Sequence, residues 1–267
     1  MSAYKIEAGT AQHIGSRPQQ NDRVALYTAA KAPGYVMAVL ADGMGGSIGS
    51  DQVLLTSKHL FDEYRAGDAP SLPRLQELLR NVALEAHAVI KMNPLVANAE
   101  PQSTVVVLIL TPAGQAVWAY VGDSRLYRFA GEATALRSND AAYVDFLVTN
   151  DGLPVDAAKK HRNSKLLSNV LGNRMKPPFV TTGMHEGLQA GDAFLLCSDG
   201  LWQLFADQEL AAAVARNTPR QASEKLINKA IERAGGKGDN CSMAIIKLVA
   251  PPKETPSYTV QKMGRAV

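Results

Sequence analysis

Short apolar runs alternate along this chain with polar, glycine-containing turns, and this pattern predicts many β-strands. The runs occupy residues 4–14, 35–41, 104–111, 116–121, 126–129, 193–198 and 241–249. A turn at residues 112–115 joins two runs directly, and no crossover helix separates the runs between 104 and 129. The strands are therefore expected to pair mainly antiparallel.

Other segments carry apolar residues at helical spacing or begin with residues that favour helix starts. Ser50 and Asp51 are expected to cap a helix that runs toward residue 65, and residues 73–92 are expected to form a second helix. Asp207 and Thr218 are expected to begin two further helices. Antiparallel sheets combined with separate helices indicate the α+β class.

Aspartates stand at four predicted strand ends, each beside a glycine. Asp42 and Asp199 follow apolar runs and precede glycine, Asp123 follows a glycine, and Asp239 precedes the last apolar run. A buried strand holds such a carboxylate in place, and the carbonyl of Gly43 can approach a ligand because glycine has no Cβ. These hard oxygen atoms suit Mg²⁺ or Mn²⁺. Asp-Gly is also a common turn signal, but its recurrence favours a convergent metal site over four independent turns.

The composition is that of an ordinary globular protein of 267 residues, with 46% hydrophobic and 20% charged residues. A net charge of +3 without basic runs argues against nucleic-acid binding. No apolar stretch reaches membrane-spanning length and no signal peptide is recognisable, so a cytoplasmic location is expected. Cys197 and Cys241 are too few for a disulfide framework, and we expect them to be small buried hydrophobes rather than a redox switch.

Five short segments of the chain carry the candidate aspartates together with glycine, arginine or other polar residues. They are residues 17–22, 42–46, 122–125, 198–202 and 238–240. Together they resemble the motifs of the metal-dependent protein phosphatases of the 2C type, in their compact bacterial form. The resemblance spans residues 15–248 and implies a four-layer α-β-β-α sandwich. In that fold, two mainly antiparallel sheets are flanked by helices and the metal site lies at one end of the sheets.

The resemblance also implies a role for each matching aspartate. Asp42 would bridge two tightly bound Mn²⁺ or Mg²⁺ ions and place the water that attacks phosphorus. Asp199 and Asp239 would hold the first ion, and the carbonyl of Gly43 would hold the second. Asp22 would support the ions, mostly through water.

Two further residues complete the implied site. Asp123 would bind a third, weaker metal, and Arg17 would bind the substrate phosphate. Four positions depart from the family pattern: Asn21, Met44, Gln102, near which the family usually has a glycine, and Ala141, where the family often has a histidine. Asn21 replaces the acidic residue expected before Asp22, and Met44 replaces the histidine that is proposed to protonate the leaving group in eukaryotic relatives.

The implied activity is hydrolysis of phosphoserine and phosphothreonine in proteins, opposing a Ser/Thr kinase. We expect one catalytic domain over residues 1–250, acting as a monomer, with a flap at about 150–178 and a flexible tail at 251–267. The alternative is a pseudophosphatase that binds phosphoproteins or scaffolds a complex without turnover. Such a protein is expected to lose a core aspartate, whereas all of them are present here, so the enzyme is favoured.

Overall fold

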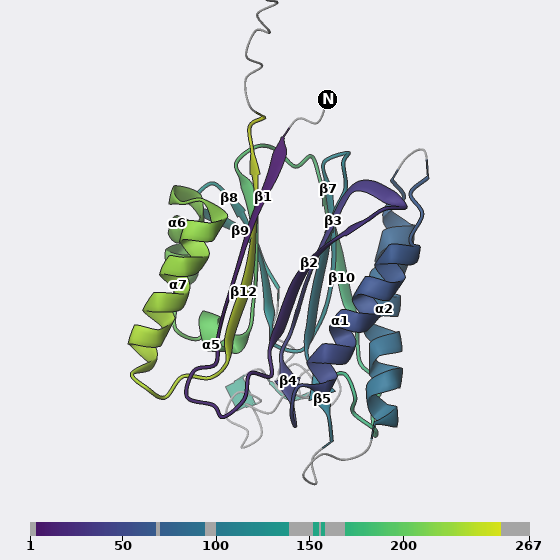
Figure 1. Ribbon diagram of the computed structural model, residues 1–267, viewed down its shortest axis with the longest axis vertical. Helices are drawn as coiled ribbons and strands as arrows, with labels where there is room; N and C mark the ends of the chain where they lie inside the picture. Colours follow the sequence, from purple (N-terminus) through teal and green to yellow (C-terminus); the bar gives the residue numbers. More distant parts are fainter. Residues whose placement is uncertain are drawn as a thin grey trace, which may run out of the picture.

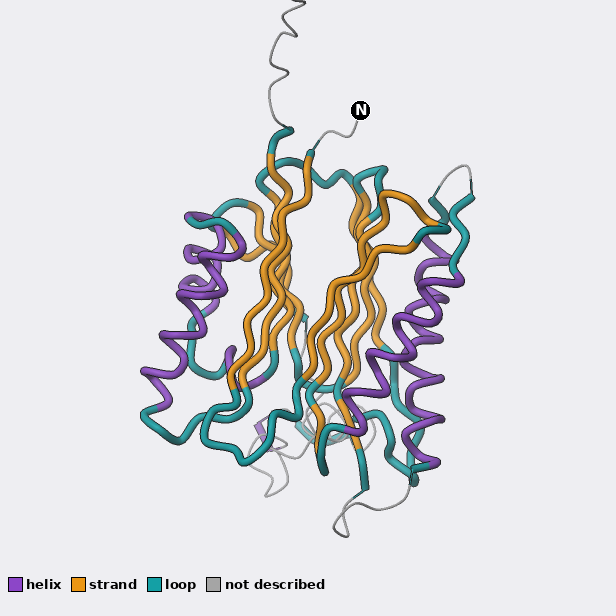
Figure 2. The backbone as a smooth tube through the Cα atoms, viewed as in Figure 1, coloured by secondary structure: helices purple, strands orange, loops and turns teal. Residues whose placement is uncertain are grey.

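The computed structural model is a sandwich of two β-sheets with a pair of helices on each outer face (Figures 1 and 2). It describes residues 4–67, 70–93, 100–138, 152–154, 156–157 and 169–251. The layers follow the order helix, sheet, sheet, helix, which is the α+β arrangement that the sequence predicts. Residues 150, 151, 155 and 158–168 of the expected flap and residues 252–267 of the expected tail lie outside the described residues.

Sheet I contains the first and last strands of the described chain, and all of its strand pairs are antiparallel. Its spatial order is β1 (Lys5–His13), β12 (Cys241–Val249), β11 (Asp192–Cys197), β8 (Arg125–Ala130) and β9 (Ala133–Arg137).

Sheet II is also antiparallel throughout. Its order is β10 (Thr181–Glu186), β7 (Gln115–Val121), β6 (Val105–Leu110), β3 (Ala32–Ala41) and β2 (Arg23–Ala29). A separate two-stranded ribbon pairs β4 (Gly43–Met44) with β5 (Gln102–Ser103) just beyond the end of β3.

Two helices cover each sheet, as Figure 1 shows. Helices α1 (Ile48–Glu63) and α2 (Leu72–Met92) pack on sheet II, while α6 (Asp207–Arg216) and α7 (Pro219–Ala234) pack on sheet I. A single-turn helix, α5 (Asp199–Trp202), follows β11 directly. Among the described residues, no helix is long and apolar enough to cross a membrane.

The continuous apolar run of β6 is explained by burial on both of its faces. Val107 and Ile109 point to the core beneath α1 and α2, whereas Val106 and Leu108 point to the core between the two sheets. A third core, which includes Leu195, lies between sheet I and helices α6 and α7. The sheets are therefore rigid supports for whatever their strand ends carry.

Two helix starts differ from the sequence prediction. Helix α1 begins at Ile48 after Ser47, so Ser50 is not the cap; its hydroxyl lies inside the first turn and donates to the carbonyls of Ser47 and Asn21. Helix α6 begins at Asp207, after Ala206 rather than after Asp207 itself.

The start of α7 agrees with the sequence prediction. Thr218 is its N-cap, and its side chain accepts a hydrogen bond from the backbone N–H of Gln221. Gly235 ends the helix in the left-handed conformation.

The antiparallel register gathers the aspartate-bearing turns at one end of the sandwich. Asp42 follows β3 and Asp22 precedes β2, and these strand ends lie together because Arg23 pairs with Ala41. Asp199 follows β11, and Asp239 lies just before β12. These two strand ends also adjoin, since Cys197 pairs with Met243.

Candidate metal centre

The backbone of Asp42 is fixed on both sides by residues next to the β4–β5 ribbon. Its N–H donates to Thr104 Oγ1 at 3.0 Å, and its carbonyl accepts from the Thr104 N–H at 2.9 Å and from Ser103 Oγ at 3.1 Å. Thr104 Oγ1 also lies 2.7 Å from Ser124 Oγ, next to Asp123. Thr104 therefore ties the Asp42 and Asp123 turns together.

Gly43 lies where three segments meet, and its lack of a side chain allows this packing. A Cβ placed on Gly43 would lie 2.8 Å from the Asn21 carbonyl oxygen and 2.9 Å from Ser50 Oγ. Any larger residue would push the β3 end away from the loop that carries Asp22. Gly43, whose carbonyl was expected to reach a ligand, therefore also allows backbone segments to pack closely.

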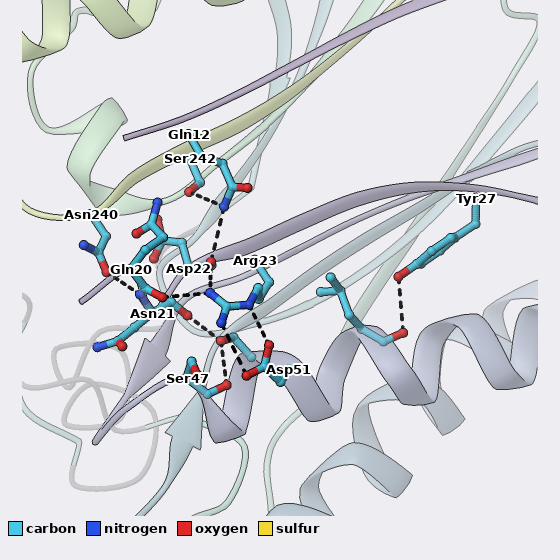
Figure 3. A network of polar contacts seen from close by, with 12 residues as sticks. Gln12, Gln20, Asn21, Asp22, Arg23, Tyr27, Ser47, Asp51, Asn240 and Ser242 are labelled. Carbon is cyan, nitrogen blue, oxygen red and sulfur yellow. Dashed lines mark hydrogen bonds and ion pairs between the residues drawn. The ribbon is translucent and has the colours of Figure 1, made fainter. Parts of the chain in front are cut away.

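Asp22 is fully buried and holds the two sheets together at this end. Its Oδ2 accepts from Ser198 Oγ at 2.7 Å, and Ser198 Oγ accepts in turn from the Ser242 N–H at 3.0 Å. Gln12 Nε2 donates to both the Asp22 carbonyl and Ser242 Oγ, each at 3.2 Å (Figure 3). Asp22 Oδ1 is buried without a hydrogen-bond partner, so an acceptor remains available on the side away from Ser198.

The loop after Asp22 is held by Arg23, whose guanidinium reaches three neighbouring groups (Figure 3). It donates to Asp51 Oδ1 at 2.6 Å, to the Gln20 carbonyl at 2.7 Å and to the Asp22 carbonyl at 2.9 Å. Arg23 thereby anchors the loop to helix α1 and fixes the backbone on both sides of Asn21.

Arg17 and Asp239 come from loops more than two hundred residues apart and form an ion pair. Arg17 Nη2 lies 2.5 Å from Asp239 Oδ2, and both side chains are partly exposed, at 58% and 39%. The hydrogen bond that Arg17 donates to Asp239 is the main cause of the raised Arg17 pKa, and the negative charges of Asp199 and Asp42 add to it. Arg17 therefore faces the same acidic centre as the other predicted residues.

The aspartates are close enough to perturb one another. Burial is the largest cause of the raised pKa of Asp42, followed by the charges of Asp22, Asp199 and Asp123. Burial and the charges of Asp123 and Asp239 raise the pKa of Asp199 to about 7. Carboxylates that raise one another's pKa in this way have an unmet requirement for positive charge.

The donor set fits hard divalent cations, because it consists of carboxylate oxygens at one locus together with a closely packed glycine backbone. In the part of the chain that the structure describes, no three acidic, histidine or cysteine side chains already converge as a closed ligand cage. The assignment of ligands to individual ions therefore remains a prediction.

Several residues that build this site were not identified from the sequence. They are the hydroxyl-bearing and amide residues Thr104, Ser124, Ser198, Ser242 and Asn240. Each adjoins a predicted aspartate in sequence or space, but short polar side chains at strand ends are too common to stand out. The strand pairing had to be known, since the contacts that place them in the site join segments 20 or more residues apart.

Comparison with known proteins gives one consistent answer, although no protein-family model matches the sequence. Serine/threonine protein phosphatase PstP of Mycobacterium tuberculosis is 29% identical over 221 residues, which cover 81% of this chain and 41% of PstP. The chain thus spans about two-fifths of the length of PstP.

Two solved structures share the fold. The S. agalactiae serine/threonine phosphatase superposes with a TM-score of 0.76 at 22% identity, covering 91% of this chain and 99% of that one. The catalytic domain of PstP in complex with two manganese ions superposes with a TM-score of 0.65 at 25% identity, covering 91% and 98%. In sequence and fold, the chain is therefore similar to bacterial serine/threonine protein phosphatases of the protein phosphatase 2C type.

Proposed function

We propose that this chain hydrolyses phosphoserine and phosphothreonine in proteins with the help of divalent cations. The observation that carries the proposal is the gathering of five strand-end aspartates and Arg17 at one end of the sandwich. The relative PstP bears the name of a serine/threonine protein phosphatase, and its catalytic domain has been solved with two manganese ions. These findings support the same chemistry for this chain.

Asp42, Asp199 and Asp239 would hold two tightly bound Mn²⁺ or Mg²⁺ ions together with the Gly43 carbonyl. When bound, such ions lower the pKa of water and offset the negative charge of phosphate oxygens. Asp22 is fully buried and accepts from Ser198, so it would support the ions mostly through water rather than by direct ligation.

Arg17 would bind the phosphate group of the substrate. Its planar guanidinium can donate to two phosphate oxygens at once, and its 58% exposure leaves it accessible from solvent. Arg17 forms an ion pair with Asp239, a predicted ligand of the first ion, and therefore lies beside the predicted position of that ion. A small rotation of the exposed side chain would present its second nitrogen to a phosphate group.

Asp123 would hold a third, more weakly bound cation next to the leaving group. Trp202 Nε1 donates to the Asp123 carbonyl at 3.0 Å and fixes this turn against α5. Met44 carries no proton that it could donate, so the proton for the leaving oxygen would come from another source, and a water held at Asp123 is the one proposed here.

Phosphorylated proteins are the proposed substrates, and a Ser/Thr kinase would supply them. We also propose that the chain acts as a monomer in the cytoplasm. The alternative of a non-catalytic phosphoprotein-binding module is disfavoured, because Asp42, Asp199 and Asp239 are all retained.

The test measures hydrolysis of para-nitrophenyl phosphate and of a phosphothreonine peptide with Mn²⁺, with Mg²⁺ and with excess EDTA. We expect activity with either metal and none with EDTA. Asp42→Asn should abolish it, whereas Glu77→Gln, at an exposed carboxylate on α2, should not. Undiminished turnover in EDTA would overturn the metal-dependent mechanism, and phosphopeptide binding without turnover would favour the non-catalytic alternative.

A further inference from the structure

Three segments that carry the predicted site residues meet at a single buried residue, Asn240. One segment is the loop between β1 and β2, which carries Arg17 and Asp22. The second begins α5 at Asp199, and the third contains Asp239 itself. Asn240 is 5% exposed and lies beside this loop in Figure 3.

The side chain of Asn240 holds the Arg17 loop at both of its ends. Nδ2 donates to the Ile14 carbonyl at 2.8 Å and to the Gln19 carbonyl at 3.0 Å. Oδ1 accepts from the Asn21 N–H at 2.7 Å. Only this orientation of the amide satisfies two carbonyls and one N–H, so both of its donor hydrogens and its oxygen are bonded to the loop.

The backbone of Asn240 is packed against the other two segments. Its N–H donates to Asp239 Oδ1 at 2.8 Å, which leaves Oδ2 of the same carboxylate for Arg17. A Cβ on Gly200 would lie 2.1 Å from the Asn240 carbonyl oxygen, so α5 touches this residue with no space between them. Gly15 packs equally closely on the Asp239 carbonyl.

We infer that Asn240 is a positioning residue for phosphate binding, acting through Arg17; this inference rests on the proposed function. Residues 14 and 19 flank Arg17, and both are fastened by the same amide nitrogen. Without that amide, the loop keeps the bonds from Ser16 to Gly238 and those from Arg23 and Ser50 to residues 20 and 21. It loses the bonds at residues 14 and 19, on the two sides of Arg17. The loop around Arg17 would then be less ordered. Holding the Arg17 guanidinium against a phosphate group would cost more conformational entropy, so phosphate would bind more weakly.

The test is a double-mutant cycle on the binding of inorganic phosphate, measured by isothermal titration calorimetry in saturating Mn²⁺. Asn240→Ala should weaken phosphate binding about tenfold in the otherwise unchanged protein, the equivalent of one or two hydrogen bonds. In the Arg17→Ala background, the same change should alter phosphate affinity less than about twofold, because the group that Asn240 positions is already gone.

Asn217→Ala is the matched control. Asn217 also donates from its amide to a backbone carbonyl, that of Ala213, but at the end of α6. The Asn217→Ala variant should bind phosphate with unchanged affinity. If Asn240→Ala does not fold, Ser16→Ala replaces it, because Ser16 Oγ donates to the Gly238 carbonyl at 2.9 Å from an exposed position in the same junction. Ser16→Ala should weaken phosphate binding about twofold to threefold, again only when Arg17 is present.

An equal loss with and without Arg17 would overturn the inference, since Asn240 would then support the site only in general. Unchanged phosphate affinity in Asn240→Ala, or no phosphate binding by the wild type, would overturn it as well. The proposed function fails separately, if the wild type binds Mn²⁺ and phosphate but hydrolyses no phosphate ester. The binding cycle still decides the role of Asn240 in that case.

Discussion

Asp199→Asn should stabilise the metal-free protein at neutral and alkaline pH while it weakens metal binding. The Asp199 carboxyl is surrounded by other acidic groups, and its pKa is raised from 3.8 to about 7 by burial and by the charges of Asp123 and Asp239. Between these two pH values the folded protein binds a proton that the unfolded chain releases. The free energy of unfolding therefore falls as the pH rises from about 4 through about 7.

The size of the effect follows from the pKa difference. A shift of about three units at about 1.36 kcal/mol per unit corresponds to about 4 kcal/mol, and partial solvent access of Asp199 reduces this to about 2–4 kcal/mol. Asparagine keeps an oxygen that can accept from Gln203 Nε2 but carries no charge. For a chain of this size, about 1 kcal/mol moves the melting temperature by roughly 2–4 °C. We therefore expect Asp199→Asn to melt at least about 5 °C higher at pH 8.

The assay is thermal unfolding in EDTA from pH 5 to pH 8, followed by circular dichroism. The wild type should lose stability along this range, and the variant should lose less. Added Mn²⁺ should reverse the order, since the ion stabilises a site that keeps its carboxylate. Asp156→Asn, at an exposed carboxylate, controls for the general effect of removing one charge. Equal melting temperatures for wild type and Asp199→Asn at pH 8 in EDTA would refute the reasoning.

Three further predictions follow from the contacts described above. Arg17→Ala should lower kcat/KM by about ten- to a hundredfold, the loss of a charge-assisted contact, while calorimetry shows Mn²⁺ affinity unchanged or higher; a collapse of Mn²⁺ affinity would contradict this. Asp123→Ala should slow hydrolysis of a phosphoserine peptide more than that of para-nitrophenyl phosphate, which has the better leaving group, and equal losses would count against a leaving-group role. Leu79 lies on the buried face of α2, and Leu79→Ala should lower the free energy of unfolding, measured with urea, by about 2–5 kcal/mol. The exposed control Leu55→Ala should lower it by less than about 0.5 kcal/mol.

The apolar pattern predicted the long strands better than the local details, and the four-layer order came from the family resemblance. Apolar runs such as residues 105–110 are strong signals, because a strand buried on both faces leaves no polar position. The β4–β5 ribbon, β9 and the short helix α5 were not predicted, because each is too short to show a period. Tertiary contacts such as the Ser103 and Thr104 bonds to Asp42, rather than local preference, stabilise the ribbon.

In the candidate site, too, some residues could be predicted from the sequence and others could not. Aspartates beside glycine at strand ends could be found along the chain, and family resemblance supplied Arg17. The supporting contacts could not be found, because the Ser198 bond to Asp22 and the Asn240 bonds to the Arg17 loop span more than 170 residues. The sequence also gave no sign that Arg17 would pair with Asp239, which depends on where two exposed loops come together.

The pairing of β1 with β12 places the outer ends of both strands at the end of the sandwich opposite the aspartate loops. Lys5 pairs with Val249 and His13 pairs with Cys241, so the outer ends of both strands lie eight residue steps from the aspartate loops. At about 3.4 Å per step, this separation is about 27 Å. Both strand ends emerge together at the top of Figure 1, opposite the β4–β5 ribbon. A tether or surface joined there would leave the acidic end pointing outward, within reach of large substrates approaching from solution.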